Sequence, residues 1–167
     1  VTLKNGAEVT TGSLFIKAEE MSLSGDDWKT ISAKGDISVT DSERGIEINT
    51  ESLWFDREDE LLVISSWFEI DDTTEELYAQ AGSLRYDMKN EKLEMGMQVT
   101  LFKIADGEVM KCTSESVIYD KSSGMLTLKG GAKVVWKGDN YEAQIITVDT
   151  NDNTISLSGR IKGTING

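Results

Sequence analysis

A gapless internal repeat constrains this chain more than any other feature of its sequence. The segments TESLWFD (50–56), AGSLRYD (81–87), SESVIYD (114–120) and AQIITVD (143–149) align without insertions, and their final aspartates are 31, 33 and 29 residues apart. The segment AEEMSLS (18–24) is a fifth, degenerate copy that ends in serine. Repeats of this size cannot bury an apolar face alone, so stacked copies must share one core. We therefore expect a single domain over residues 1–167.

The aligned columns show which side chains face that core. Apolar residues stand one, three and eight positions before the final residue of each copy, and small residues stand six positions before it. The inward parity changes once in each copy, and a β-bulge produces such a change of phase. We expect these bulges near Glu51-Ser52, Gly82-Ser83, Glu115-Ser116 and Gln144-Ile145. The inward columns are Leu23, Phe55, Tyr86, Tyr119 and Val148; Met21, Leu53, Leu84, Val117 and Ile146; Ala18, Thr50, Ala81, Ser114 and Ala143; and Ile16, Ile48, Ala79, Cys112 and Tyr141.

Each repeat continues into a second strand. The aspartate is expected to begin a turn, because its carboxylate can accept hydrogen bonds from the backbone just ahead of it. Residues 73–81 have the composition of a helix, but their place in the repeat predicts a strand. The chain is therefore predicted to be all-β: an open, twisted antiparallel jellyroll of about five strand-pair repeats, each about 30 residues long. The second strands carry the apolar pairs Leu62/Ile64, Leu93/Met95, Leu126/Leu128 and Ile155/Leu157.

Composition excludes several functions. The net charge of -13 and the pI of about 4.4 repel a phosphate backbone, so we expect no nucleic-acid partner. The chain has no histidine, which removes the common catalytic triads, and it has no glycine-rich loop that would cradle nucleotide phosphates. The single cysteine, Cys112, lies in an inward column and is expected to be a small core residue. We expect no enzyme activity and no cofactor.

Other patterns favour ordinary structural roles. The acidic clusters 56–60 and 71–76 are expected to be solvated turns. Asp149, Asn151 and Asn153 resemble the start of a calcium-binding loop, but Thr154 stands where that loop needs glycine and Arg160 where it needs glutamate. No pair among the 30 acidic residues is singled out for glycoside chemistry. Trp28 and Trp54 are expected to be exposed, where they are available to a ligand or partner.

The repeat resembles that of the OstA-like family, which includes LptA, LptC and the N-terminal domain of LptD. The matching stretches are SESVIYDKSSGMLTLKGGAKVVW (114–136) and AKGDISVT (33–40). The resemblance implies a folded, taco-shaped jellyroll that holds lipid acyl chains and joins end to end through its edge strands. It also implies a periplasmic protein whose targeting segment has been removed. The start of the chain shows no signal-peptide pattern, and no apolar run is long enough to span a bilayer.

The resemblance also implies partners and a lipid-binding groove. The partners are lipopolysaccharide or another acyl-chain lipid, and further OstA/LptA-like domains or copies of this chain. The groove residues are Ile16, Met21, Leu23, Ile37, Val39, Ile48, Leu53, Phe55, Leu62, Ile64, Leu84, Tyr86, Leu93, Met95, Val117, Tyr119, Leu126, Leu128, Ile146, Val148, Ile155 and Leu157.

Two other functions remain open from the sequence. An ordinary filled core would explain the apolar columns equally well, and the chain would then be a structural β-solenoid, filament or adhesin stalk. Charged side chains would in that case block the edge strands. A carbohydrate-binding β domain that uses the exposed tryptophans is the other alternative.

Overall fold

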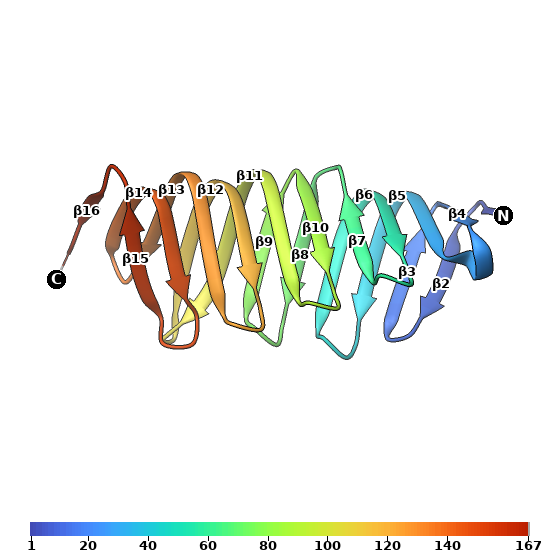
Figure 1. Ribbon diagram of the computed structural model, residues 1–167, viewed down its shortest axis with the longest axis horizontal. Helices are drawn as coiled ribbons and strands as arrows, with labels where there is room; N and C mark the ends of the chain where they lie inside the picture. Colours follow the sequence, from blue (N-terminus) through green and yellow to red (C-terminus); the bar gives the residue numbers. More distant parts are fainter. Residues whose placement is uncertain (167) are drawn as a thin grey trace.

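The computed structural model describes residues 1–166, one short of the end of the predicted domain, and consists almost entirely of antiparallel strands (Figure 1). A single short 3-10 turn, η1 (Asp26–Trp28), interrupts them within these residues. The predicted all-β class is thereby confirmed. The strands are β1 (Thr2–Leu3), β2 (Ala7–Thr11), β3 (Leu14–Ala18), β4 (Glu20–Ser24), β5 (Thr30–Asp41), β6 (Ile46–Asp56), β7 (Leu61–Ile64), β8 (Phe68–Asp72), β9 (Leu77–Ala81), β10 (Ser83–Asp87), β11 (Lys92–Ala105), β12 (Glu108–Asp120), β13 (Met125–Trp136), β14 (Asp139–Asp149), β15 (Thr154–Ser158) and β16 (Lys162–Thr164).

Six long strands belong to two sheets at once. One half of β5 pairs with β4 and the other half with β3, and β6, β11 and β14 are divided in the same way. β12 and β13 keep the same neighbours along both halves, with a register shift between the halves. The first sheet runs β1-β4-β5-β6-β7-β10-β11-β12-β13-β14-β15. The second runs β2-β3-β5-β6-β8-β9-β11-β12-β13-β14-β16. The sheets fold over one another along a line of bends, which we call the spine.

Bulges make the bends of the spine. Gly35 and Asp36 together oppose Glu51, and the same two-against-one mismatch recurs where β13 meets β14. These bulges therefore lie at the predicted positions along the repeat. The extra residue, however, belongs to the strand that pairs with the aligned segment and not to the segment itself. Near Gly82 the chain instead breaks between β9 and β10. At Gly130, which has a φ of 85°, an added Cβ would collide with the Glu115 side chain, so this bend requires glycine.

The repeated aspartates begin the turns of the first sheet, as predicted. Asp56 Oδ1 accepts hydrogen bonds from the backbone N–H groups of Glu58 (2.9 Å) and Asp59 (3.0 Å). Asp87, Asp120 and Asp149 do the same in their own turns. These bonds satisfy backbone donors that the hairpin leaves unpaired.

Two hairpins of the second sheet use the same device, which the repeat alignment did not reveal. Asp41 Oδ1 accepts from the N–H groups of Glu43 and Arg44, each at 3.1 Å, and Asp72 Oδ1 accepts from Glu75 N–H at 3.0 Å. The Asp72 turn corrects one prediction. Residues 73–81 were expected to be strand throughout, but 73–76 form the turn and only 77–81 are strand.

The inward columns form one apolar core between the two sheets. Nearly every predicted inward residue is buried, Cys112 among them; Leu23 and Tyr141 are only partly buried. Trp28 and Trp54 are exposed, as expected. Within residues 1–166, no helix has the length and apolar character needed to cross a membrane.

The Asp41 turn provides a first prediction. The side chain is almost fully buried and also accepts a hydrogen bond from Arg44 Nη1 at 2.7 Å. Replacing it in Asp41→Ala removes three acceptor contacts, and we expect the free energy of unfolding to fall by about 2 kcal/mol. Asp41→Asn keeps an oxygen for the turn and should lose less. Urea unfolding of both variants checks this; equal losses would show that the turn bonds contribute little.

Candidate functional site

The predicted groove residues come together in the interior between the sheets. Most of them are less than a tenth exposed and contact one another in a continuous cluster that follows the stack from β2 to β15. In this structure, therefore, the predicted groove is a filled, apolar interior. Only three of its predicted members, Leu23, Ile155 and Leu157, are partly exposed, and they lie at the two ends of the stack.

The second sheet supplies interior residues that the repeat alignment missed. Phe68 and Ile70 of β8 and Leu101 of β11 are each almost completely buried. They face the first sheet across the same core. Their alternation with exposed Glu69 and half-buried Phe102 is the signal that would have identified them.

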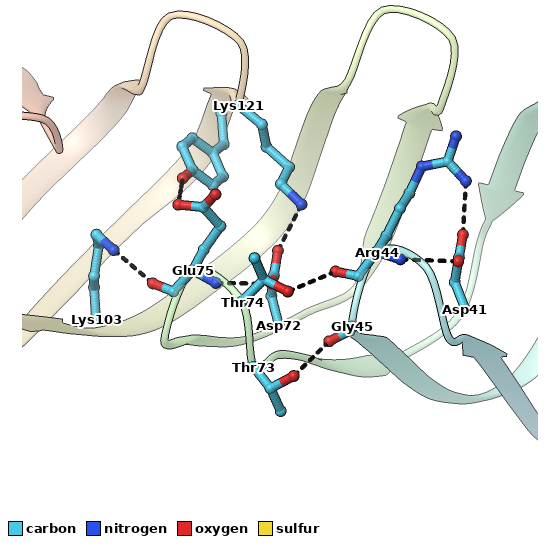
Figure 2. Close-up of polar contacts among 10 residues, drawn as sticks. Asp41, Arg44, Gly45, Asp72, Thr73, Thr74, Glu75, Lys103 and Lys121 are labelled. Atoms are coloured by element: carbon cyan, nitrogen blue, oxygen red, sulfur yellow. Dashed lines mark hydrogen bonds and ion pairs between the residues drawn. The ribbon is translucent and has the colours of Figure 1, made fainter.

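The edge of the interior opposite the spine is closed by hairpin turns from both sheets, and we call this edge the seam. Lys121, in the β12–β13 turn of the first sheet, contacts Asp72 of β8 in the second sheet, with Nζ and Oδ2 2.7 Å apart (Figure 2). The two side chains are only 10% and 4% exposed. This ion pair joins the sheets directly over the interior.

Neighbouring polar contacts strengthen the seam at the same point. Tyr119 OH donates to Glu75 Oε2 at 3.4 Å, and Lys103 Nζ donates to the Glu75 backbone oxygen at 2.6 Å (Figure 2). The Thr73 and Thr74 hydroxyls donate to the backbone oxygens of Gly45 and Arg44, which connects adjacent turns of the second sheet.

Two further contacts cross the seam toward its ends. Arg57 Nε, in the β6–β7 turn, donates to Thr11 Oγ1 at 3.2 Å. Asn153 Nδ2, in the β14–β15 turn, donates to Asp106 Oδ1 at 3.1 Å. Both pairs are solvent-exposed, so each contributes little to stability and can part at low cost.

One polar group points into the interior without a partner. The Tyr86 hydroxyl is buried and makes no hydrogen bond within residues 1–166. Burial raises the pKa of this hydroxyl well above its usual range. The positive charge of Arg44 lowers this pKa in part, and the negative charge of Asp72 raises it further. A buried, unpaired donor is costly, so the interior contains a polar point beneath the seam that a bound molecule would satisfy.

The two ends of the stack are the places where the apolar core reaches the surface. Leu3 and Val9 join Leu23 at the N-terminal end, and Trp136 and Tyr141 join the two residues of β15 at the other. Each end also finishes in edge strands: β1 and β2 at one, and β15 and β16 at the other (Figure 1). Their outer backbone groups are free to pair with a further strand.

The other predicted features are placed as follows. Asp149, Asn151 and Asn153 use their side chains within and between turns. Within residues 1–166, no three acidic or cysteine side chains are grouped as metal ligands would be. Burial raises the pKa of the Cys112 thiol to about 12, so it is held as the unreactive thiol.

The turn aspartates make stability depend on acid pH. Hydrogen bonds from Ser122 and Ser123 lower the pKa of Asp120, and those from Asn90 lower the pKa of Asp87. Burial alone would raise the pKa of Asp41, but its bonds with Arg44 outweigh this and lower it.

Carboxyls with lowered pKa values in the folded state stabilise it fully above their unfolded pKa of about 3.9, and this contribution is lost as pH falls through the folded values. We expect the urea midpoint to be nearly constant from pH 7 to 5 and to drop from about pH 4 downward. The triple variant Asp41→Asn/Asp87→Asn/Asp120→Asn should show a shallower drop. A midpoint that is unchanged at pH 3 would contradict this account.

Comparison with known proteins gives a fold similarity only. No protein-family model and no curated protein matches the sequence. The chain is similar to the crystal structure of LptH, the LptA-homologous periplasmic component of the lipopolysaccharide transport device from Pseudomonas aeruginosa. The identity is 17% and the TM-score 0.44, over 92% of this chain and 95% of that one. At this level of similarity, function has to come from the chain's own residues.

Proposed function

We propose that this chain, as one unit over residues 1–167, is a lipid-binding and transport module of the OstA-like type. It holds the acyl chains of lipopolysaccharide or a related amphipathic lipid between its two sheets and passes them toward the outer membrane. One observation carries this proposal: a continuous apolar interior runs the length of the stack, reaches the surface at both ends, and is closed along one side by polar side chains.

The energetics favour acyl chains as the cargo. Moving an acyl chain out of water releases about 0.8 kcal/mol for each buried CH₂ group, so a single chain gains more than the exposed seam contacts cost to part. The interior itself is lined by Leu, Ile, Val, Phe and Met side chains, of which the unbranched Met side chains adapt most readily to a new neighbour. The unpaired Tyr86 hydroxyl would then find a partner in the polar part of the lipid.

The free edge strands fit an end-to-end arrangement. Pairing β15 or β16 with the N-terminal strands of another copy, or of another jellyroll domain, would cover the exposed ends of the core and continue the interior into the next unit. The module would work in the periplasm, and direction would come from its partners. We expect no catalysis.

Native mass spectrometry with lipopolysaccharide and with simple phospholipids tests this function. Saturable one-to-one binding is expected. A seam-locked variant, Asp106→Cys/Asn153→Cys joined by a short thiol cross-linker in a Cys112→Ala background, should take up lipid at least about tenfold more slowly, since these side chains meet across the seam. Cleaving a reducible version of the linker should restore uptake.

The matched control introduces a different pair of cysteines, both within the second sheet, and joins them with the same cross-linker. Glu8→Cys/Lys17→Cys replaces an exposed ion pair of neighbouring strands, so its cross-link leaves the seam free. Equal slowing in both variants would show that lipid does not enter at the seam. If none of the lipids tested binds, the proposed lipid function is wrong.

A structural role is the second candidate, and the tight burial of the interior favours it. Inward side chains such as Ile16, Leu62 and Leu126 are completely buried and packed as in an ordinary core. A structural stack would show oligomers that grow with concentration and no lipid binding. The same mass spectra distinguish the two candidates.

A further inference from the structure

A groove of about 680 Å³ lies on the outer side of the spine, near the C-terminal end of the stack. Its lining residues come from the bulge of β13, from β14, and from the link and strand that follow β15. Its basic residues are exposed on the outer surface, while Ala132 and Ala143, which belong to the apolar core, form part of its lining. Lys129, Lys133, Arg160 and Lys162 border it.

The charge around this groove is opposite to that of the whole chain. The protein has 30 acidic and 17 basic residues, yet four basic side chains and a single acidic one, Glu142, line the groove. Glu142 is matched by Lys133, with Oε1 and Nζ 3.3 Å apart. Within residues 1–166, Lys129, Arg160 and Lys162 have no carboxylate oxygen within 4 Å. Three basic side chains without an ion pair in this range therefore border one groove, and the Glu115 side chain lies beside Gly130 at its margin.

The floor of the groove leaves room for a ligand to approach the backbone. Gly131, with a φ of 56°, has no atom within 4 Å of the place where a Cβ would stand. Ile145 adds an exposed apolar side chain beside this floor. The groove therefore combines positive charge, open backbone and a small apolar contact.

We propose that this groove binds a phosphate group. Arginine presents a planar fork of donors that matches two phosphate oxygens, and lysines add point charges around it. A phosphate group carries up to two negative charges on one compact group, which suits the three basic side chains that form no ion pair within residues 1–166. The phosphate is either a free phosphate compound or the headgroup of an anionic lipid. This site is independent of the proposed acyl-chain interior, so either one can fail alone.

NMR titration of the isotope-labelled protein with pyrophosphate tests the site, together with co-sedimentation on phosphatidylglycerol vesicles and on phosphatidylcholine vesicles. The phosphatidylcholine vesicles carry no net charge and control for binding that does not depend on the negative charge of the headgroup. We expect amide shifts confined to residues 129–133, 142–145 and 158–162, and binding that weakens as salt is added. Binding of pyrophosphate and phosphatidylglycerol vesicles together supports the site for both sources. Pyrophosphate alone points to a free phosphate compound, and the vesicles alone to a lipid headgroup.

Charge-matched variants make the result specific. Arg160→Gln/Lys162→Gln should weaken binding about tenfold or more, corresponding to two lost charge-assisted contacts. The control Arg85→Gln/Lys89→Gln removes the same charge from exposed positions of β10 and its turn, outside the groove, and should bind normally. Equal weakening in both variants, or no binding to either probe, would overturn the proposal.

Discussion

Replacing Phe68 with alanine is expected to lower the free energy of unfolding by about 3–5 kcal/mol. Phe68 begins β8, is completely buried, and packs in the core beneath the spine. Truncation removes the transfer free energy of a large ring and leaves a cavity that the two rigid sheets cannot close fully. Guanidinium unfolding followed by circular dichroism measures the loss.

The adjacent residue provides a matched control. Trp67 is 51% exposed, next to Phe68 in the chain but outside the core. Trp67→Ala removes a larger side chain, yet it should cost less than about 1 kcal/mol because little apolar surface leaves a packed environment. Similar losses for the two variants would mean that the sheets do not enclose a tightly packed interior.

Breaking the buried ion pair of the seam should have the second large effect. In Lys121→Met, Asp72 keeps its charge but loses the ammonium group 2.7 Å away, inside a mostly buried site. An uncompensated buried charge typically costs about 3–5 kcal/mol. We expect a loss of about 3 kcal/mol in urea unfolding, and faster lipid uptake through the weakened seam.

Two further variants separate this ion pair from other causes. Asp72→Asn/Lys121→Met leaves no charge but keeps an oxygen for the Glu75 turn bond, and it should recover most of the lost stability. Lys133→Met removes an exposed pair of the same type and should cost less than about 1 kcal/mol. A double variant no more stable than Lys121→Met would show that the charge of Asp72 is not the cause.

The interior of the first sheet could be predicted from the sequence because its residues repeat in fixed columns. Leu84, Val117 and Ile146 occupy equivalent positions and are all buried. An aspartate sets the turn in four of the copies, so the alignment placed the turns and the strands that follow them, and it located the bends without showing which strand carries the extra residue. The fold class follows directly from these local regularities.

One turn of the second sheet was mispredicted because it lacks the usual signals. Glu76 occupies a left-handed position, with a φ of 50°, where a turn would ordinarily show glycine or asparagine. With no turn signal to separate them, Thr73 to Glu76 were therefore assigned to the strand that the repeat predicted over 73–81. Phe68 and Ile70 were missed because the alignment was anchored on strands of the first sheet.

The seam could not be predicted from sequence. Lys121 and Asp72 are 49 residues apart and meet only because the two sheets fold over one another. The same holds for Asn153 and Asp106, which are 47 residues apart. Such contacts depend on the curvature of the spine, and no local pattern records that curvature.

The most direct test of the lipid function is to locate the acyl chain within the protein. Methyl-labelled, otherwise deuterated protein bound to lipid should give intermolecular nuclear Overhauser effects from acyl CH₂ groups. We predict that they reach methyl groups of Ile64, Leu84, Val117 and Leu128, which line the middle of the interior. Effects limited to exposed methyls such as Val109 and Ile161, or none at all, would contradict an acyl-chain site between the sheets.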